Sequence, residues 1–400
     1  MSAATTLKLS SPFDAHVHLR QGALMKLVAP HVARGGVKAC FVMVSSSHLI
    51  PFEACSLISP SSPPSLPLPQ PNLVPPLTKP SQTMDYLTQL QAQAPQTQFL
   101  MSLYLTRSLT PSMIREAHSN GIVGVKSYPR GVTTNSEGGV GMEGYSIFDE
   151  VFAEMEKCDM VLNLHGEVPS DVDGDGTCVL NAEERFLPHL REIHNKFPKL
   201  RIVLEHCTTA AAVECVKTLP SNVCATITPH HLSLTIDQAV SSSLHFCKPL
   251  AKYPSDRSAL RSVIAQGHPQ FFLGSDSAPH PSEAKLPMLN YTHTHIDGVE
   301  GQEIVLPSPC AAGIYTQADL IPLVATIFEK AEIPLERMEG YVSEFGRRFY
   351  RIPAKKGEEV ELRRVEGKKV EKAFGFEGEK CREFVVPFMA GEELGWELVV

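Results

Sequence analysis

The chain has 400 residues, of which 43% are hydrophobic and 20% are charged, and its formal net charge is −8. These proportions are typical of a globular enzyme, and the lack of a basic block argues against a nucleic-acid partner. No apolar run approaches the roughly 20 residues needed to span a bilayer, and Met1–Ser11 lacks the regions of a signal peptide. The ten cysteines form no CxxC pair, so we expect reduced, mostly buried thiols in a cytoplasmic protein.

Short β-rich runs alternate with helical patterns along most of the chain. The predicted strands are Phe13–Leu19, Ala39–Met43, Phe99–Leu105, Gly124–Tyr128, Met160–His165, Arg201–Glu205, Val223–Thr228 and Phe271–Ser275. The predicted helices between them are Thr83–Ala92, Pro111–Asn120, Ile147–Cys158, Ala182–Lys196, Thr209–Leu219 and Ser255–Gln266. This alternation predicts a parallel sheet, and eight repeats predict an α/β protein with a (β/α)₈ TIM barrel. An open doubly wound sheet is the alternative, but it calls for a Gly-rich phosphate turn after the first strand, which the sequence lacks.

Two regions lie outside this pattern. Helical patterns at Gln317–Lys330 and Leu335–Phe345 precede a charged tail, Arg351–Lys380, whose alternation suggests short exposed strands. We interpret residues 351–400 as an extension packed on the barrel of a single domain, residues 1–400. Val44–Gln70 is rich in Ser and Pro, and an ordered loop of this length would be unusual there. We interpret it as a retained intron in the gene model, the alternative being a disordered surface insert.

The first predicted strand ends in a stretch with candidate functional side chains, Asp14-Ala-His-Val-His-Leu-Arg20. Residues two apart on a strand face the same way, so His16 and His18 point together, with Arg20 next in line. Two imidazoles form half of a transition-metal site, and a guanidinium beyond them is suited to bind a carboxylate. Taken alone, the His-x-His pattern is more typical of a surface strand with two ordinary histidines.

Further candidate metal ligands stand at the ends of later strands. They are Lys126, His165, His206 and Asp276, at the ends of the fourth, fifth, sixth and eighth strands. Active sites of these barrels are built at the carboxyl ends of the strands, so we expect the side chains to converge. Four imidazoles, a carboxylate and a lysine that CO₂ can convert to a carbamate suit two Zn²⁺ ions per subunit.

Together these motifs resemble the amidohydrolase superfamily and, within it, the class II (bacterial-type, stand-alone) dihydroorotase family. The resemblance covers nearly the whole chain except Val44–Gln70. The matching segments are Asp14–Arg20, Pro71–Pro76, Lys126–Ser136, His165–Glu167, Glu205–Thr209, Thr226–His231, Gly274–His280 and Val386–Glu392.

The resemblance implies a set of site residues. One metal ion is expected on His16, His18 and Asp276 and the other on His165 and His206, with carbamylated Lys126 (N6-carboxylysine) and a hydroxide bridging them. The substrate's carboxylate is expected to bind Arg20, Asn72 and His280, and its ring to contact the backbone around Lys248 and Ala312. Thr133 and Thr134 match a mobile loop that closes over the substrate.

The implied activity is reversible hydrolysis of L-dihydroorotate to N-carbamoyl-L-aspartate, a step of de novo pyrimidine (UMP) biosynthesis, with Asp276 moving the proton. The family also suggests a homodimer. Two departures are notable: Lys248 replaces a leucine, and the region Pro281–Pro309, which precedes Ala312, differs from the family pattern.

Two other functions remain open. A hydantoinase or dihydropyrimidinase would share the metal ligands but would not need residues that bind a substrate carboxylate. A non-catalytic scaffold derived from such an enzyme is the second alternative. We assign no functional role to His48, His230 or His231.

Overall fold

Eight parallel strands form the sheet around which the rest of the chain is arranged. The computed structural model describes residues 6–43, 77–130, 139–141, 144–170, 174–286, 291–292, 303–304, 310–377 and 382–399. The strands are β2 (Phe13–Val17), β3 (Ala39–Val42), β4 (Gln98–Tyr104), β5 (Gly124–Ser127), β6 (Val161–His165), β7 (Arg201–Glu205), β8 (Val223–Ile227) and β9 (Phe271–Leu273). They lie in the order of the chain, each parallel to the next. The prediction of a (β/α)₈ barrel is confirmed, and each predicted strand differs from the observed one by at most two residues at either end.

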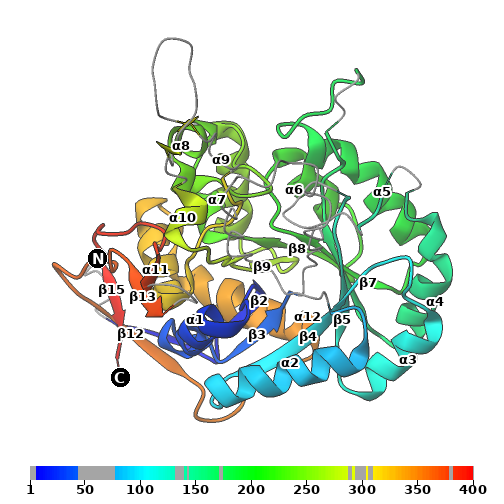
Figure 1. Ribbon diagram of the computed structural model, residues 1–400, viewed down its shortest axis with the longest axis horizontal. Helices are drawn as coiled ribbons and strands as arrows, with labels where there is room; N and C mark the ends of the chain where they lie inside the picture. Colours follow the sequence, from blue (N-terminus) through cyan, green and yellow to red (C-terminus); the bar gives the residue numbers. More distant parts are fainter. Residues whose placement is uncertain are drawn as a thin grey trace.

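Helices surround this sheet, as Figure 1 shows. They are α1 (Gly22–Arg34), α2 (Pro80–Gln93), α3 (Pro111–Ser119), α4 (Asp149–Lys157), α5 (Ala182–Lys196), α6 (Ala210–Lys217), α7 (Pro229–Ser233), α8 (Ile236–Ser241), α9 (Pro254–Ala265), α10 (Ser282–Lys285), α11 (Leu320–Lys330) and α12 (Phe345–Tyr350). Helix α1, which has Pro30 inside it, was not predicted. The predicted helix Leu335–Phe345 is instead a 3₁₀ turn at Leu335–Arg337 and a π-helical segment at Gly340–Glu344, followed by α12.

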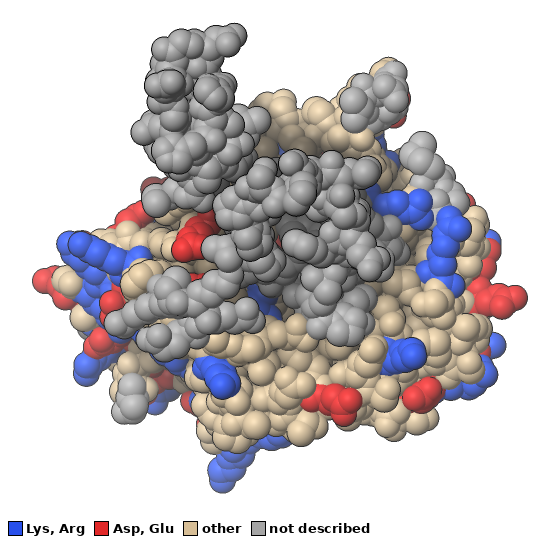
Figure 2. Space-filling model, in the orientation of Figure 1, with Lys and Arg blue, Asp and Glu red and all other residues tan. Residues whose placement is uncertain are grey.

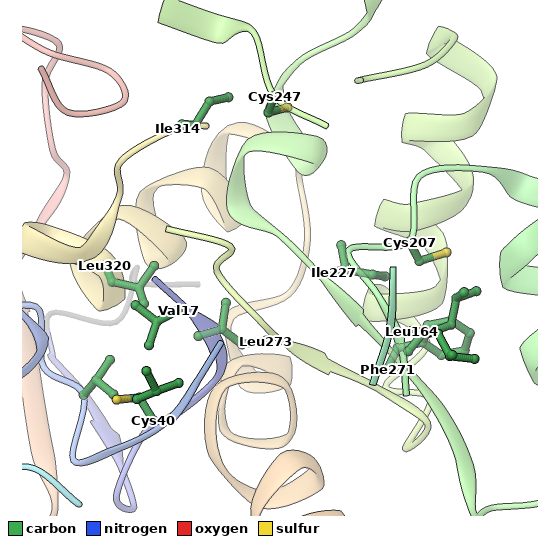
Figure 3. Close-up of a cluster of buried hydrophobic side chains, with 14 of the residues drawn as sticks. Val17, Cys40, Leu164, Cys207, Ile227, Cys247, Phe271, Leu273, Ile314 and Leu320 are labelled. Carbon is green, nitrogen blue, oxygen red and sulfur yellow. The ribbon is translucent and has the colours of Figure 1, made fainter. Parts of the chain in front are cut away.

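Apolar side chains pack on both sides of the strands. Outside the barrel, Val17, Leu273 and Leu320 gather between the strands and α11 (Figure 3). Inside it, Phe13 and Phe41 pack against Tyr350 of α12, with ring centroids 5.4 and 5.1 Å apart. The amino-terminal end of the barrel is therefore filled by side chains, which leaves the carboxyl-terminal end for a site.

The C-terminal extension pairs with the start of the chain. Strand β12 (Val360–Arg364) lies between β1 (Thr6–Leu9) and β15 (Trp396–Leu398) in an antiparallel sheet. Strands β13 (Phe374–Glu377) and β14 (Arg382–Val385) form a separate hairpin. The tail strand was expected to be exposed, yet Val360 and Leu362 are buried, while Arg363 and Arg364 face solvent. The Trp396 indole donates to Glu329 of α11 at 2.8 Å, which joins this sheet to the barrel.

The described surface carries charges of both signs. On the face seen in Figure 2, basic and acidic side chains are interspersed. Among the described helices, none has the length and apolar character required to cross a membrane. Val44–Gln70 lies outside the described residues, and so does His48, so the interpretation of that segment stays a prediction.

Candidate active site

The first group of candidate ligands is assembled where the barrel closes. The backbone N–H of Asp276 donates to the His16 carbonyl at 2.9 Å, and that of His18 donates to the Ser277 carbonyl at 3.0 Å. The Asp14 carboxylate accepts two further bonds, from the Ser275 N–H at 2.8 Å and the Ser275 hydroxyl at 2.6 Å. These bonds join β2 to the segment after β9 and bring the predicted ligands of both together.

His16, His18 and Asp276 form a buried group of three. Both Nε2 atoms lie 3.2 Å from Asp276 Oδ1, and they are 3.3 Å from each other. Burial lowers the pKa of His18 to about 3, so its ring is neutral, as a metal ligand must be. Burial alone would raise the pKa of Asp276, but the His16 charge and bonds from both histidines hold it well below its usual value. Two imidazoles, of which that of His18 is neutral, and an ionised carboxylate at this spacing suit a zinc-like ion.

His165 and His206 lie beside this group, at the ends of β6 and β7. Their ring centroids are 4.5 Å apart, and the His206 ring is 5.2 Å from that of His16. Burial lowers the pKa of both residues, and the charge of Lys126 acts in the same direction. Within the described part of the chain, the buried His206 Nδ1 has no hydrogen-bond partner. An unsatisfied buried nitrogen is costly, and a bound cation would satisfy it.

Lys126 completes the group from β5. Its side chain is fully buried, and Nζ has no hydrogen-bond partner among the described residues. Nζ instead lies 5.0 Å from the centroid of the Tyr128 ring. Burial lowers the pKa of Lys126 to about 8, so a larger share of the amine is neutral near physiological pH than in an exposed lysine. A neutral amine can react with CO₂, and the resulting carbamate offers oxygen ligands. The donor set therefore fits a binuclear metal centre.

The predicted anion-binding residues lie at the same mouth of the barrel. Arg20 Nη2 is 3.2 Å from His280 Nε2, and Arg20 Nε donates to the Pro279 carbonyl at 2.9 Å. His280 Nε2 also lies 2.8 Å from the Ala312 carbonyl oxygen. Burial lowers the pKa of Arg20 to about 10, which leaves the guanidinium charged at neutral pH. Arg20, His280 and Ala312 thus form one connected group with a fixed positive charge.

Lys248 belongs to the neighbouring segment. The Gly313 N–H, next to Ala312, donates to the Phe246 carbonyl at 3.0 Å, so the segments that carry Lys248 and Ala312 are hydrogen-bonded to each other. The remaining predicted contacts, Asn72, Thr133 and Thr134, lie outside the described residues and stay predictions.

Three of these residues adopt a left-handed backbone. The φ angles of Arg20, His206 and Asp276 are 58°, 41° and 45°. Residues other than glycine rarely adopt this conformation, and where they do, they often stand at functional sites. Each of the three follows the end of a barrel strand, where the chain must turn sharply.

Three acidic and basic residues that position the ligands were not predicted. Glu205 Oε2 accepts from His16 Nδ1 at 2.8 Å and from the Thr226 hydroxyl at 2.6 Å. Glu167 Oε2 is 2.9 Å from His165 Nε2, and Lys252 Nζ is 3.5 Å from Glu167 Oε1. Such carboxylates fix the tautomer and orientation of a metal-binding histidine. An available signal was the acidic residue beside a strand-end histidine, in Glu205-His206 and His165-Gly-Glu167.

A second group with metal-ligand chemistry consists of His230, His231 and Cys247. His231 is already engaged at both nitrogens, with the Thr228 hydroxyl at 2.9 Å and the Pro249 carbonyl at 3.1 Å. The Cys247 thiol also donates to the Pro249 carbonyl. Because two of the three side chains have other partners, this group is better explained as part of the packed interior.

Comparison with known proteins gives a consistent result. No family model matches the chain. A dihydroorotase from Mycosarcoma maydis is 47% identical over 98% of both chains, and one from Saccharomyces cerevisiae is 40% identical over 96% of both. The solved structure of the S. cerevisiae dihydroorotase in complex with 5-fluoroorotic acid has a TM-score of 0.81 and 38% identity, and the match covers 99% of each chain. An L-hydantoinase from Arthrobacter aurescens is 17% identical with a TM-score of 0.68, over 92% of this chain and 78% of that one, which shows a shared fold alone.

Glu205→Gln is expected to weaken zinc binding by about 10- to 100-fold. The amide keeps the shape of the side chain but removes the negative charge that faces His16 Nδ1. The affinity of metal-stripped protein is measured by competition with a chelating dye. Glu214→Gln, at an exposed acid of α6, is the matched control and is expected to bind zinc normally. Equal affinities in the two variants would contradict the role of Glu205.

Proposed function

The chain belongs to the dihydroorotase family, and from this premise we propose how its residues carry out the reaction. It is a metal-dependent hydrolase of a cyclic amide that converts L-dihydroorotate reversibly to N-carbamoyl-L-aspartate, a step of pyrimidine biosynthesis. Relatives of the same name at 40–47% identity span nearly the whole chain. The observation that favours this substrate in particular is the buried pair Arg20 and His280 beside the candidate metal ligands, because it offers a charged site for the ring's carboxylate.

Two zinc ions would be held by the residues that converge at the barrel mouth. His16, His18 and Asp276 would bind one ion and His165 and His206 the other, and the carbamate of Lys126 would bridge them. Bound zinc supplies a Lewis acid that lowers the pKa of water and polarises a carbonyl group. The carbamate is favoured here because it replaces an unpartnered buried ammonium by an anion among cations.

Asp276 is proposed as the group that moves the proton. Its pKa lies well below the usual value, so the carboxylate is ionised and can accept a proton at neutral pH. As water adds to the ring carbonyl, Asp276 takes the proton that the water loses. It then returns this proton to the amide nitrogen as the ring C–N bond breaks, so the carboxylate is regenerated.

Substrate orientation is proposed to depend on the anion group. Arg20 is held by the Pro279 carbonyl through Nε, so its guanidinium is pre-organised for a carboxylate. His280 and Asn72 would complete that contact, and backbone atoms near Lys248 and Ala312 would face the ring. Thr133 and Thr134 would close over it.

We also propose a single-domain, cytoplasmic homodimer, in line with the expectations drawn from the sequence. Val44–Gln70 is proposed to be a retained intron. Sequencing of the mature transcript tests this, because codons for these residues in the mature message would exclude it.

The function is tested by assaying zinc-loaded protein with L-dihydroorotate and with 5,6-dihydrouracil, which lacks the carboxylate. The unaltered chain is expected to turn over dihydroorotate with a strong preference. Arg20→Ala should lose about 2 kcal/mol of transition-state stabilisation, or about 30-fold in kcat/KM, because a charge-assisted hydrogen bond is removed.

Arg115→Ala, at an exposed arginine of α3, is the control and should keep full activity. A chain that hydrolyses dihydrouracil as well as dihydroorotate would overturn the assigned substrate. Unchanged kcat/KM in Arg20→Ala would remove Arg20 from the carboxylate site.

Asp276→Asn is expected to retain at least one zinc ion but to lose at least about 100-fold in turnover, because an amide cannot accept the proton. Zinc content is measured on the same sample as kcat. Asp237→Asn, at an exposed position of α8, serves as the control. Normal turnover by Asp276→Asn would rule out the proton-transfer role.

Carbamate formation on Lys126 is expected to depend on pH with a midpoint near 8. Below the pKa of about 8 the amine is protonated and cannot attack CO₂, and above it the neutral form predominates. At constant dissolved ¹³CO₂, the rate of carbamate formation in metal-stripped protein, followed by ¹³C NMR, should rise through this pH and then level off. The signal of the Lys126 carbamate should be absent from Lys126→Arg, whatever carbamates form on other amines. A rate that keeps rising to about pH 10, as for an exposed lysine, would contradict the shifted pKa.

A further inference from the structure

Lys285 is a buried lysine that the reaction scheme above does not use. It ends the short helix α10, and the residue is only 5% exposed. Nζ donates to the Phe246 carbonyl at 2.8 Å and to the Ala311 carbonyl at 2.9 Å. A single ammonium group therefore joins two segments that are far apart in the sequence.

These two segments are the ones proposed to face the substrate ring. Phe246 lies two residues before Lys248, and Ala311 lies immediately before Ala312. The Phe246 carbonyl accepts a second bond from the Gly313 N–H at 3.0 Å, and the Ala311 N–H donates to the Ala284 carbonyl at 2.9 Å. Lys285 thus stands at the centre of a small network that fixes both backbones.

The backbone at Ala312 and Gly313 packs directly against His280, one of the proposed anion-binding residues. Gly313 has a φ of 153°, and a Cβ added there would lie 2.7 Å from His280 Nε2 and 2.7 Å from the Ala278 carbonyl oxygen. Only glycine fits, so the backbone at Ala312 and Gly313 lies directly against the His280 ring. A displacement of this backbone would therefore also displace His280, whose Nε2 is 2.8 Å from the Ala312 carbonyl.

No acid in the described part of the chain balances the charge of Lys285. Among the described residues, no carboxylate oxygen lies within 4.0 Å of Nζ, although Lys252, another buried lysine, has Glu167 as such a partner. Burying an ammonium without a counter-charge is costly, and two carbonyl oxygens offset only part of this cost. The positive charge of Lys285 acts on His280, one of the proposed anion-binding residues. It lowers the pKa of His280, although burial and the charge of Arg20 have larger effects. An anionic ligand beside His280 would add a negative charge on the same side of these segments as the Lys285 cation.

We propose that Lys285 is a positioning residue for the substrate, which ties the Phe246 and Ala311 carbonyls so that the backbones at Lys248 and Ala312 face the ring. Its charge adds to that of Arg20 in attracting the anionic substituent. The ligand class is a small cyclic amide that carries a carboxylate. This inference rests on the proposed function, because it concerns the same substrate.

The test compares Lys285→Met, which has a similar length but no charge or donor, with the unaltered chain. KM for L-dihydroorotate should rise about tenfold or more, because the ring-facing backbones loosen and a cation is lost. The turnover number should change less than about threefold and the zinc content not at all, because the metal ligands and Asp276 are untouched. Lys285→Arg, which keeps the charge and donors, should restore part of the affinity. Lys330→Met, at an exposed lysine of α11, is the control and should leave KM unchanged.

Lys285→Gln is a second neutral variant, which still donates hydrogen bonds and so guards against misfolding of the methionine variant. An unchanged KM in either neutral variant, once folded, would overturn the inference. So would a loss of zinc and turnover without a change in KM, since that would indicate a purely structural role. An unaltered chain that fails to hydrolyse dihydroorotate would instead overturn the proposed function, and with it this inference.

Discussion

The closure of the barrel between β2 and the segment after β9 is the contact on which the candidate site depends. The two backbone bonds that join His16 to Asp276 and His18 to Ser277 are part of this closure. The fully buried Asp14 carboxylate also stabilises this closure, because it accepts hydrogen bonds from the backbone N–H and the hydroxyl of Ser275. Because the strands that meet here carry the ligands themselves, closing the barrel and assembling the first metal position are a single event. The site is therefore as rigid as the sheet that carries it.

The amino-terminal end of the barrel contributes stability through packing, whereas the carboxyl-terminal end holds the candidate site. At the amino-terminal end, the Tyr350 hydroxyl donates to Asn163 Oδ1 at 2.6 Å, while its ring packs on Phe13 and Phe41. At the carboxyl-terminal end, buried histidines, a lysine and carboxylates replace the aromatic filling. Two of the buried histidines there are each oriented by a carboxylate, His16 by Glu205 and His165 by Glu167. The apolar end thus stabilises a fold whose other end holds costly polar groups.

Much of the fold and of the candidate site could be predicted from the sequence, for identifiable reasons. Strand positions follow from short apolar runs, and strand-end residues such as Lys126 and His165 converge because all strands of such a barrel point the same way. Glu205 lies beside a strand-end histidine, but its actual partner is His16, which is 189 residues away, and no local pattern encodes that pairing. The buried face of β12 was missed for the same reason, since β1 and β15, which cover it, come from opposite ends of the chain. The left-handed backbone at Arg20 likewise depends on tertiary contacts, including the Tyr86 hydroxyl that donates to its carbonyl.

The left-handed residues also bear on how such a chain can evolve. Each such conformation in a residue other than glycine costs roughly 1–2 kcal/mol, and Arg20, His206 and Asp276 all adopt it. Glycine at these positions would relieve the strain while deleting a functional side chain. Selection for thermal stability alone would therefore favour glycine at these three positions. Selection for catalysis favours the present residues, so the two requirements conflict at the same positions.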